Sequence, residues 1–445
     1  MKTPICDFVE RYIKSGAARL HMPGHKGINM LGIEERDITE IDGADVLYSS
    51  NGIIRESEKN AEALFGTART VYSAEGSSLS IRAMLCLAVM HAREMGKRPI
   101  IAAGRNAHKV FVSTAALLDF EVEWIYSTDG SLISCDITAD SLAAALDEMT
   151  VKPTALYITS PDYLGNIVSI KGIAEVCHKR GMLLLVDNAH GAYLGFLPES
   201  MHPIMLGADM SADSAHKTLP VLTGGGYLQI SKTAPAMLAE RAEYAMSLFA
   251  STSPSYLILQ SLDAANRYLS DGYRERLVGF IKKLDTLRAA LIRHGFTLIG
   301  NEPLKLTLAP KFFGYTGCEL ADILAENGIV CEFSDPDYTV MMPTPEQGER
   351  VLADALRVLT SLKPRAAIVT LPPKLGRPSR AMTPREATFS PCESVKIEDA
   401  HGRILASAQI SCPPAIPIAV CGEVIDGDVI AALGYYAVGE VTVTK

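Results

Sequence analysis

Helical and strand-like patterns of apolar residues alternate along the chain from about residue 60 to residue 235. Residues 81–96 have the length and apolar spacing of a mostly buried helix, and residues 170–181 have the pattern of a second helix. Three continuous apolar runs are typical of strands buried on both faces: residues 98–103, 154–161 and 182–187. We therefore predict an α/β fold with a parallel-rich sheet that helices cover on both faces.

The rest of the chain predicts smaller units. The pattern is mainly helical from about residue 236 to 295, and strand-like segments of an α+β unit follow. Residues 363–384 are rich in proline and basic residues, which is typical of a linker. The predicted domains are an irregular N-terminal arm (1–60), a large α/β domain (61–245), a helical connection with a small α+β domain (246–365), and a linker with a small, strand-dominated C-terminal domain (366–445).

Composition and charge narrow the function. The chain has 445 residues, of which 48% are hydrophobic and 21% charged, as in well-packed globular proteins. Its net charge of −9, without a run of lysine and arginine, argues against nucleic-acid binding and suits a cationic substrate. The longest apolar stretches, such as residues 84–90, are too short to span a membrane.

Nine scattered cysteines form no CxxC pair, so no zinc or other metal site is predicted. This pattern is typical of reduced thiols in a cytoplasmic protein. The first residues, MKTPICDFVERYIKSG, carry early acidic residues and no long apolar run, so we expect no signal peptide there.

The candidate chemistry lies where the predicted strands end. Asp187 closes the run 182–187, and ligands of open α/β sheets bind outside the carboxyl ends of the strands. Lys217 follows in a polar segment beside Ser214 and His216. Pyridoxal phosphate (PLP) needs a lysine for a Schiff base and an acid against its pyridine nitrogen. Taken alone, the pair fits an ordinary strand-end aspartate and a solvated lysine better.

Two further segments strengthen the case for a PLP site. Ser77 and Ser78 lie in a Gly-Ser-Ser turn that runs into a helix, where they could bind an anion or simply cap the helix. His108 follows a predicted strand and could lie over a planar ring, or be a surface-loop histidine. A phosphate turn, a histidine, an aspartate and a lysine in this order within one α/β region favour a PLP site.

Several motifs together resemble the ornithine/lysine/arginine decarboxylase family of fold-type-I PLP enzymes, in its short form. The matching segments are LHMPGHKG (20–27), DITEIDGADVLYSSNGII (37–54), RNAHKV (105–110), ITSPDYLGNIVSI (158–170), VDNAHGAYLGF (186–196), SAHKTLPVLTGGGYL (214–228), STSPSYLILQSLD (251–263) and CPPAIPIAVCGEVI (412–425). The chain departs from the family pattern at Asn188, where glutamate is more frequent, at the glycines 224–226 and Gln229, and at Pro413-Pro414-Ala415.

The resemblance implies roles for the matched residues. Lys217 would carry PLP as a Schiff base, and Asp187 would pair with the pyridine nitrogen. His108 would stack on the ring, and His190 would flank it. Four residues would hold the phosphate or its surroundings: Ser77, Ser78, Ser214 and His216. In this fold type the site lies between two subunits, so we expect a homodimer or a higher homo-oligomer, in which Thr252 or Ser253 would reach the phosphate of the partner subunit.

The implied reaction is decarboxylation of arginine, lysine or ornithine to agmatine, cadaverine or putrescine, in polyamine biosynthesis. A distal cation needs a carboxylate, and Glu332 is our first candidate, with Asp335 behind it and Asp42 or Asp45 as further choices. A solvated acidic turn is the alternative for Glu332. Two alternatives to the function stay open: another PLP reaction, such as transamination or elimination, and a PLP-binding homologue without activity.

Overall fold

The computed structural model describes residues 1–128, 131, 133–374, 376–407, 411–412 and 416–445. Pro413, Pro414 and Ala415, one of the departures from the family pattern, lie outside these residues. The chain divides into two compact units. Unit 1 comprises Met1–Arg98 and Ile170–Arg276, and unit 2 comprises Pro99–Ser169 and Leu277–Lys445. Each unit therefore combines segments that are far apart in the sequence.

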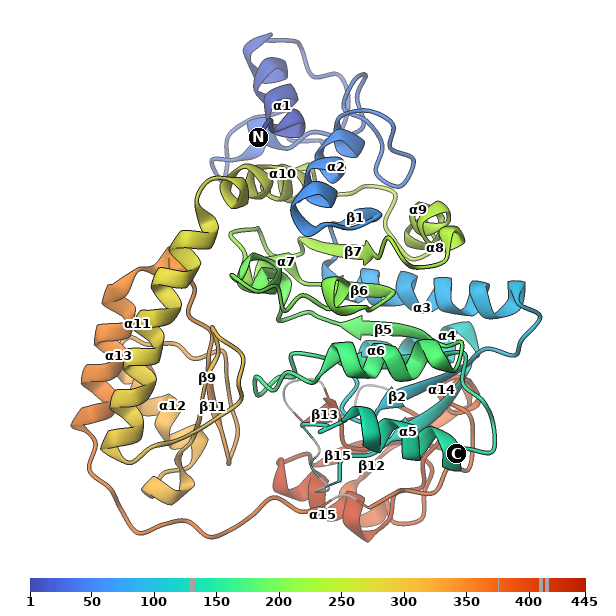
Figure 1. The fold of residues 1–445 in the computed structure, drawn as a ribbon, viewed down its shortest axis with the longest axis vertical. Helices are drawn as coiled ribbons and strands as arrows, with labels where there is room; N and C mark the ends of the chain where they lie inside the picture. Colours follow the sequence, from blue (N-terminus) through green and yellow to red (C-terminus); the bar gives the residue numbers. More distant parts are fainter. Residues whose placement is uncertain (129–130, 132, 375, 408–410, 413–415) are drawn as a thin grey trace. The chain divides into compact units, whose positions relative to one another are not determined.

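The large sheet has seven strands in the order β1-β7-β6-β5-β4-β2-β3 (Figure 1). Strand β7 is antiparallel to β1 and β6, whereas β5–β6, β2–β4 and β2–β3 are parallel pairs. The prediction of a parallel-rich α/β sheet is confirmed, and the three predicted apolar strands correspond to β2, β4 and β5. The strands are β1 (Arg69–Ser73), β2 (Ile100–Gly104), β3 (Glu121–Ile125), β4 (Ala155–Thr159), β5 (Leu183–Asp187), β6 (Met210–Asp213) and β7 (Gly226–Ile230).

Helix α3 (Gly76–Glu94) is the central helix of unit 1, and it packs on β1, β7, β6 and β5 (Figure 1). It begins five residues before the predicted helix (81–96), because the Gly-Ser-Ser turn already belongs to its first turn, and it ends at Glu94, two residues before the predicted end. The other helices that begin in residues 1–98 or 170–276 are α1 (Pro4–Lys14), η1 (Glu34–Arg36), α2 (Ile53–Phe65), α6 (Ile170–Lys179), η2 (Ala192–Phe196), η3 (Pro203–Leu206), α7 (Ala215–Thr218), α8 (Ala236–Glu240), α9 (Ala242–Ser247), α10 (Tyr256–Ser270) and α11 (Tyr273–His294).

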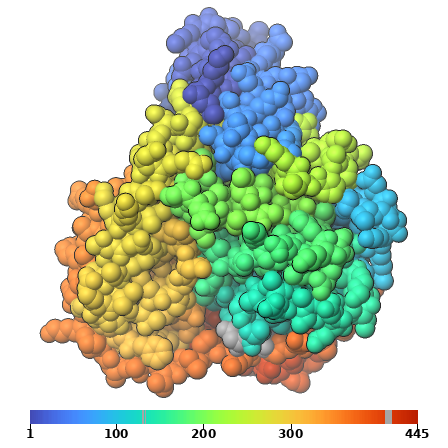
Figure 2. All heavy atoms as spheres, viewed as in Figure 1, coloured from blue at the N-terminus to red at the C-terminus, as the bar shows by residue number. Residues whose placement is uncertain are grey.

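The N-terminal residues differ from the predicted irregular arm, because the chain begins with helix α1. Pro4 occupies the first turn, where a missing N–H does no harm, and Ile5 and Val9 are buried one helical turn apart. Helix α1 contacts α2, and in the space-filling view the dark-blue N-terminal residues lie against the lighter blue of α2 (Figure 2). An apolar spacing of four residues in this short segment was the signal for the helix.

Unit 2 contains a four-stranded antiparallel sheet in the order β10-β11-β9-β8, besides β2, β3 and β4. The C-terminal region pairs β12 with β15 and β13 with β14, and it also contains two helices, so it is less dominated by strands than predicted. The elements of unit 2 are α4 (Lys109–Leu118), α5 (Ala139–Glu148), β8 (Thr297–Ile299), β9 (Leu306–Ala309), η4 (Pro310–Phe313), α12 (Gly317–Glu326), β10 (Phe333–Ser334), β11 (Thr339–Met341), η5 (Pro345–Gln347), α13 (Glu349–Ser361), α14 (Pro384–Phe389), β12 (Cys392–Lys396), η6 (Ile397–Asp399), β13 (Ser411–Cys412), β14 (Ile416–Pro417), α15 (Gly427–Tyr435) and β15 (Glu440–Thr444).

A buried arginine joins the C-terminal region to the end of β2. Arg105 donates to the carbonyl oxygens of Pro417 (2.9 Å) and Ile418 (3.1 Å) and pairs with the buried Glu423 at 3.2 Å. The central carbon of its guanidinium also lies 5.3 Å from the centroid of the Trp124 ring. Because a buried charge is tolerated only when it is paired and hydrogen-bonded, these contacts hold the C-terminal segment in place.

No helix within the described ranges has both the length and the apolar character needed to cross a bilayer.

Candidate functional site

The end of β5 brings Asp187 into the interior of unit 1. Asp187 is the last residue of the strand, as predicted, and only 3% of its surface is exposed. The backbone N–H of Ala189 donates to its Oδ1 at 3.2 Å. A buried carboxylate at the carboxyl end of a parallel strand is suited to meet a positively charged ligand group in the crevice outside the sheet.

Lys217 lies in the short helix α7, directly after β6. Its Nζ is 3.1 Å from Nε2 of His190, which is buried in the turn after β5. Since β5 and β6 are neighbouring parallel strands, their ends bring these two residues together. The amine and the imidazole can exchange a proton at this distance. Asp187, His190 and Lys217, which we predicted from sequence, therefore come from the ends of two adjacent strands.

The N-terminus of α3 is open to an anion. Its N-cap residue is Glu75, which makes no side-chain capping bond, so neither Ser77 nor Ser78 is the N-cap. The hydroxyl of Ser214 donates to Oγ of Ser77 at 2.7 Å. Because the first N–H groups of a helix have no intrahelical acceptor, they and these hydroxyls suit a phosphate. Three of the predicted phosphate-binding serines thus lie in unit 1 around one helix end.

The glycine run before β7 allows this helix end to form. Gly224 has φ +98°, and its carbonyl accepts the N–H of Gly76 at 2.6 Å. A Cβ at Gly226 would lie 2.9 Å from the carbonyl oxygen of Asp213 and 3.2 Å from the nitrogen of Ser77. His216, another predicted phosphate-site residue, has Nδ1 2.9 Å from the carbonyl oxygen of Gly225. A side chain at Gly226 would therefore require the neighbouring backbone to move.

A fully buried carboxylate that we did not predict from the sequence lies beside these residues. Asp213 ends β6, and its Oδ1 accepts from Asn188 Nδ2 (2.8 Å) and Ser211 Oγ (3.2 Å). Its Oδ2 accepts from His202 Nε2 (2.9 Å) and from Gln229 Nε2. All five side chains are at most 1% exposed. We call them the Asp213 network. Asn188, His202 and Gln229 belong to segments other than β6, which carries Ser211 and Asp213, so no single motif indicated the network.

His108 lies in unit 2, at the N-cap of α4, after β2. Its Nδ1 accepts the backbone N–H of Val110 at 3.2 Å, and the side chain is half-buried. The bond fixes the orientation of the imidazole, so His108 is a capping residue rather than a mobile loop histidine. Its predicted stacking role concerns residues of unit 1 and stays a prediction.

Glu332, which we predicted to bind the substrate cation, is exposed in unit 2. It accepts a hydrogen bond from the hydroxyl of Tyr163 at 3.0 Å. Burial, and then the Glu332 carboxylate, raise the pKa of Tyr163, so this hydroxyl remains a donor. Asp335 is instead buried, and burial raises its pKa to about 6. Its Oδ1 accepts the N–H groups of Asp337 and Tyr338, so it stabilises its own turn.

Asp45, a further candidate for binding the substrate cation, stabilises its own turn. Its carboxylate accepts five backbone N–H groups at 2.9–3.4 Å, from Val46, Asn51, Gly52, Ile54 and Arg55. Asp45 and Tyr48 both have positive φ, at 69° and 68°, so this turn is strained and needs the carboxylate. Asp42, by contrast, is exposed.

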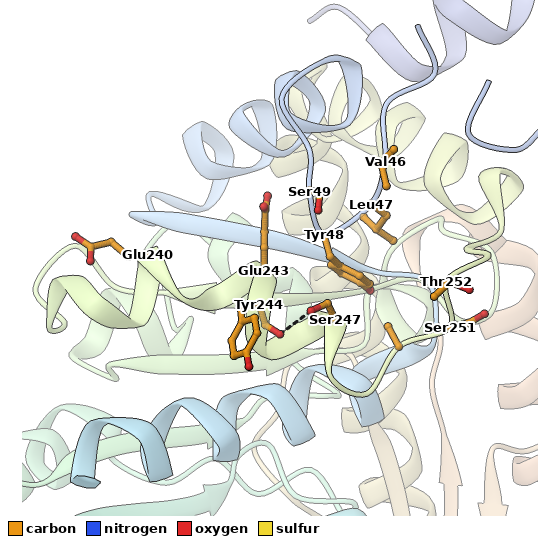
Figure 3. Close-up of a pocket in the computed structure, with 11 residues that line it drawn as sticks. Val46, Leu47, Tyr48, Ser49, Glu240, Glu243, Tyr244, Ser247, Ser251 and Thr252 are labelled. Carbon is orange, nitrogen blue, oxygen red and sulfur yellow. Dashed lines mark hydrogen bonds between the residues drawn. The ribbon is translucent and has the colours of Figure 1, made fainter. Parts of the chain in front are cut away.

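Thr252, predicted to serve a partner subunit, is exposed and lines a cavity of about 450 Å³ within unit 1. Figure 3 shows that the cavity lies among residues 46–49, helices α8 and α9, and residues 251–252. Glu240, Glu243 and several hydroxyls give it a polar lining. In the part of the chain that the structure describes, no group of three or more His, Cys, Asp and Glu residues could hold a metal ion.

Comparisons with known proteins point to one family. The model of the Orn/Lys/Arg decarboxylase major domain matches residues 3–301, and that of the C-terminal domain matches residues 371–443. The arginine decarboxylase of Halalkalibacterium halodurans is 32% identical, over 95% of this chain and 91% of that protein. The arginine decarboxylase of Bacillus subtilis is 29% identical, with the same coverage.

Solved structures show the same fold. A lysine decarboxylase from Francisella novicida superposes with a TM-score of 0.80, at 16% identity, over 100% of this chain and 81% of that one. The constitutive lysine decarboxylase of Escherichia coli gives 0.77, at 17% identity, over 100% and 82%. An alanine–glyoxylate aminotransferase from Nostoc, over 71% and 89%, gives 0.56 at 17% identity, so the fold is that of fold-type-I PLP enzymes. With both domain models matched and a relative at 32% identity, the chain belongs to the Orn/Lys/Arg decarboxylase family, whose members are PLP-dependent carboxy-lyases.

Proposed function

We propose that this chain decarboxylates arginine, with PLP held on Lys217 and Asp187 against the pyridine nitrogen. The curated relatives named arginine decarboxylase support arginine over lysine and ornithine. The observation that carries the proposal is the pair Lys217 Nζ–His190 Nε2 at 3.1 Å beside the buried Asp187. It joins an amine, a proton carrier and an acid at the ends of β5 and β6.

The residues of unit 1 fit PLP. The amine of Lys217 is only half-buried, so a carbonyl carbon can reach it. Asp187 offers a buried carboxylate for a protonated ring nitrogen. The uncapped start of α3, with Ser77 and Ser214 joined by a hydrogen bond, offers N–H and hydroxyl donors for a phosphate. We infer that Ser78 and His216 complete this phosphate site.

In the reaction, the bond between Cα and the carboxylate breaks, carbon dioxide leaves and a proton is added to Cα. PLP, when bound, supplies the electron sink that accepts the electron pair of the broken bond. Asp187 would keep a proton on the ring nitrogen, which makes that sink stronger. Lys217 Nζ and His190 Nε2 would hold and deliver the proton for Cα. The buried surroundings of these groups would strengthen each electrostatic contact.

Three further residues have roles that we predicted from the sequence. His108 would stack on the ring, with its imidazole held by the cap of α4. Glu332 would pair with the guanidinium of arginine, beside the hydroxyl of Tyr163. The exposed Thr252 would bind the phosphate in the partner subunit of a homodimer. We further propose that the enzyme is cytoplasmic and supplies agmatine to polyamine biosynthesis.

A decarboxylation screen with arginine, lysine, ornithine and a few neutral amino acids tests this proposal. We expect carbon dioxide and agmatine in equal amounts, and borohydride reduction should label Lys217. Lys217→Ala, as the matched variant, should give neither product nor label. A keto acid as product would point to transamination. Bound PLP without turnover of any basic amino acid would point to a homologue without activity, and a label on another lysine would overturn the assignment of Lys217.

A further inference from the structure

The Asp213 network has a surplus negative charge. Its four donors fill both oxygens of Asp213, so a protonated carboxyl group would have no acceptor for its own proton. His202 Nδ1 accepts the N–H of Ile204 at 3.4 Å, which places the ring proton on Nε2 and leaves the imidazole neutral. Among the described residues, His202 is the only basic side chain within ion-pair distance of Asp213.

The aromatic rings beside the network, those of Phe65 and Tyr227, are uncharged. The ring of Phe65 lies 5.7 Å from that of His202 and 5.4 Å from that of Tyr227. Burial, and then the Asp213 charge, raise the pKa of Tyr227, so its hydroxyl stays neutral. The remaining donors are the amides of Asn188 and Gln229 and the hydroxyl of Ser211. A unit negative charge is therefore held by neutral dipoles inside the protein, where it acts over a longer distance than in water.

The network lies directly behind the proposed cofactor groups. Asp187 pairs with Ala212 across β5 and β6, and the N–H of Asn188 continues the ladder to the carbonyl of Ala212 at 3.0 Å. Since successive residues of a strand point to opposite faces, Asn188 and Asp213 share the face opposite to that of Asp187. Asp213 also precedes Lys217 by only four residues, in the segment that leads from β6 into α7.

We propose that Asp213 is a positioning residue of the decarboxylase site. It ties the end of β5, which bears Asp187, to the end of β6, which leads to Lys217, and it places a fixed negative charge behind both. This charge favours protonated forms on the other face of the sheet: the ring nitrogen that Asp187 binds and the nitrogen of Lys217. The inference rests on the proposed function, because it requires PLP on Lys217.

The absorbance of PLP bound to the enzyme, titrated with pH, measures this effect without turnover. Asp213→Asn keeps the shape of the side chain and removes the charge. We expect the midpoint of the absorbance change to fall by about one pH unit, as for a unit charge on the order of 10 Å away in an effective dielectric of about 20. The double variant Asn188→Asp with Asp213→Asn returns the charge to the other end of the same hydrogen bond, and it should restore the midpoint.

Two matched variants separate charge from packing. Ser211→Ala removes one donor and keeps the charge, so its midpoint should stay within about 0.3 unit of wild type. His202→Gln keeps a neutral donor, so its midpoint should also stay. A rise in His202→Gln would mean that the histidine is protonated and cancels the charge, which overturns the inference. An unchanged midpoint in Asp213→Asn overturns it as well.

The inference about Asp213 can still be tested if Asp213→Asn does not fold. The double variant and His202→Gln then carry the test, and a lowered midpoint in the double variant counts against the inference. Failure of the proposed function is recognised separately. If the wild-type protein shows no absorbance band with added PLP, the proposed function is wrong; if the wild type titrates normally and the variants follow it, only the role of Asp213 is wrong.

Discussion

Two of the fully buried acidic residues of unit 1, Asp213 and Glu58, differ in the groups that surround the carboxylate. The fully buried Asp213 is bound by neutral donors alone. The equally buried Glu58 meets a guanidinium, since Nη1 of Arg69 lies 2.8 Å from its Oε2. The same arginine also contacts Glu62 at 3.2 Å and pairs with Glu243. A carboxylate beside a cation loses most of its field at a distance, whereas one held by dipoles keeps it.

The comparison separates a structural centre from a functional one. The Arg69 cluster, which we define as Arg55, Glu58, Glu62, Arg69 and Glu243, joins α2, β1 and α9. Its ion pairs hold these elements together. The Asp213 network also joins elements, but it leaves a charge that the neighbouring strand end can use. Buried charge by itself therefore does not indicate a site; the nature of its partners does.

The largest effect is expected in the Arg69 cluster. Arg69→Met leaves Glu58 buried without its cation, so the free energy of unfolding should fall by roughly 3–5 kcal/mol. Turnover per folded molecule should not change. Urea unfolding and an activity assay on the folded fraction measure both. Arg350→Met, at an exposed arginine of α13, is the control and should stay within about 0.5 kcal/mol of wild type. Lost turnover at full stability would give this cluster a functional role.

At Asp187 we expect the reverse: turnover should fall, and stability should change little. Asp187→Ala removes the acid against the ring nitrogen, so turnover should fall roughly 100- to 1,000-fold while the urea midpoint changes little. Steady-state kinetics with arginine at saturating PLP measures the loss. Asp322→Ala, at an exposed aspartate of α12, should behave like wild type. Nearly normal turnover in Asp187→Ala would show that another acid binds the ring.

We expect Glu58 to make the free energy of unfolding depend on pH. Burial raises the pKa of Glu58 to about 7 although Arg69 opposes the shift. The folded state thus binds the proton more tightly than the unfolded state, so this stabilisation is complete below about pH 4.5 and is lost as the pH rises through about 7. Glu58→Gln should lack this dependence.

Thermal unfolding at pH 5 and pH 8 checks that expectation. The difference in the free energy of unfolding between Glu58→Gln and wild type should shift in favour of the variant by roughly 1–3 kcal/mol from pH 5 to pH 8. Other buried acids, such as Asp263 with its pKa raised to about 6, affect both proteins equally and cancel in the difference. Parallel curves for the two proteins would show that Glu58 does not titrate in this range.

The smallest effect is expected at Glu332, because this carboxylate is exposed. Glu332→Gln should raise the Michaelis constant for arginine by roughly 1.5- to 5-fold, the usual size of an exposed charge pair. The constant for a neutral amino acid should not change. Glu326→Gln, an exposed acid at the end of α12, is the control. With an unchanged constant for arginine, Asp42 becomes the next candidate, since the Asp45 carboxylate is already engaged by five N–H groups.

Local patterns accounted for much of the fold. The continuous apolar runs predicted β2, β4 and β5, because strands buried on both faces need no polar positions. The helical run from residue 256 to 295 was less well predicted, since it is broken at Asp271 and Gly272, where Gly272 has φ +66°. A single glycine in a long amphipathic segment gave too little signal to place that break.

The site could be predicted only as far as it consists of contiguous motifs. Asp187 and Lys217 lie in short segments that, together with the Gly-Ser-Ser turn and His108, favour a PLP site, whereas the role of His190 came only from the family resemblance. The Asp213 network could not be found in the same way, because His202, Gln229 and Asn188 meet Asp213 only through the pairing of β5, β6 and β7. Contacts that depend on tertiary structure leave no spacing in the sequence.

The contact of Arg105 with Trp124 has an optical consequence. Trp124 is the only tryptophan of the chain, so the intrinsic fluorescence of the protein at long excitation wavelength reports on β3 in unit 2 alone. The guanidinium above its ring and the edge of Phe111, 5.6 Å away between centroids, define the environment of this fluorophore. Emission and the visible absorbance of a cofactor on Lys217 would therefore follow the melting of the two units as separate signals in one cuvette.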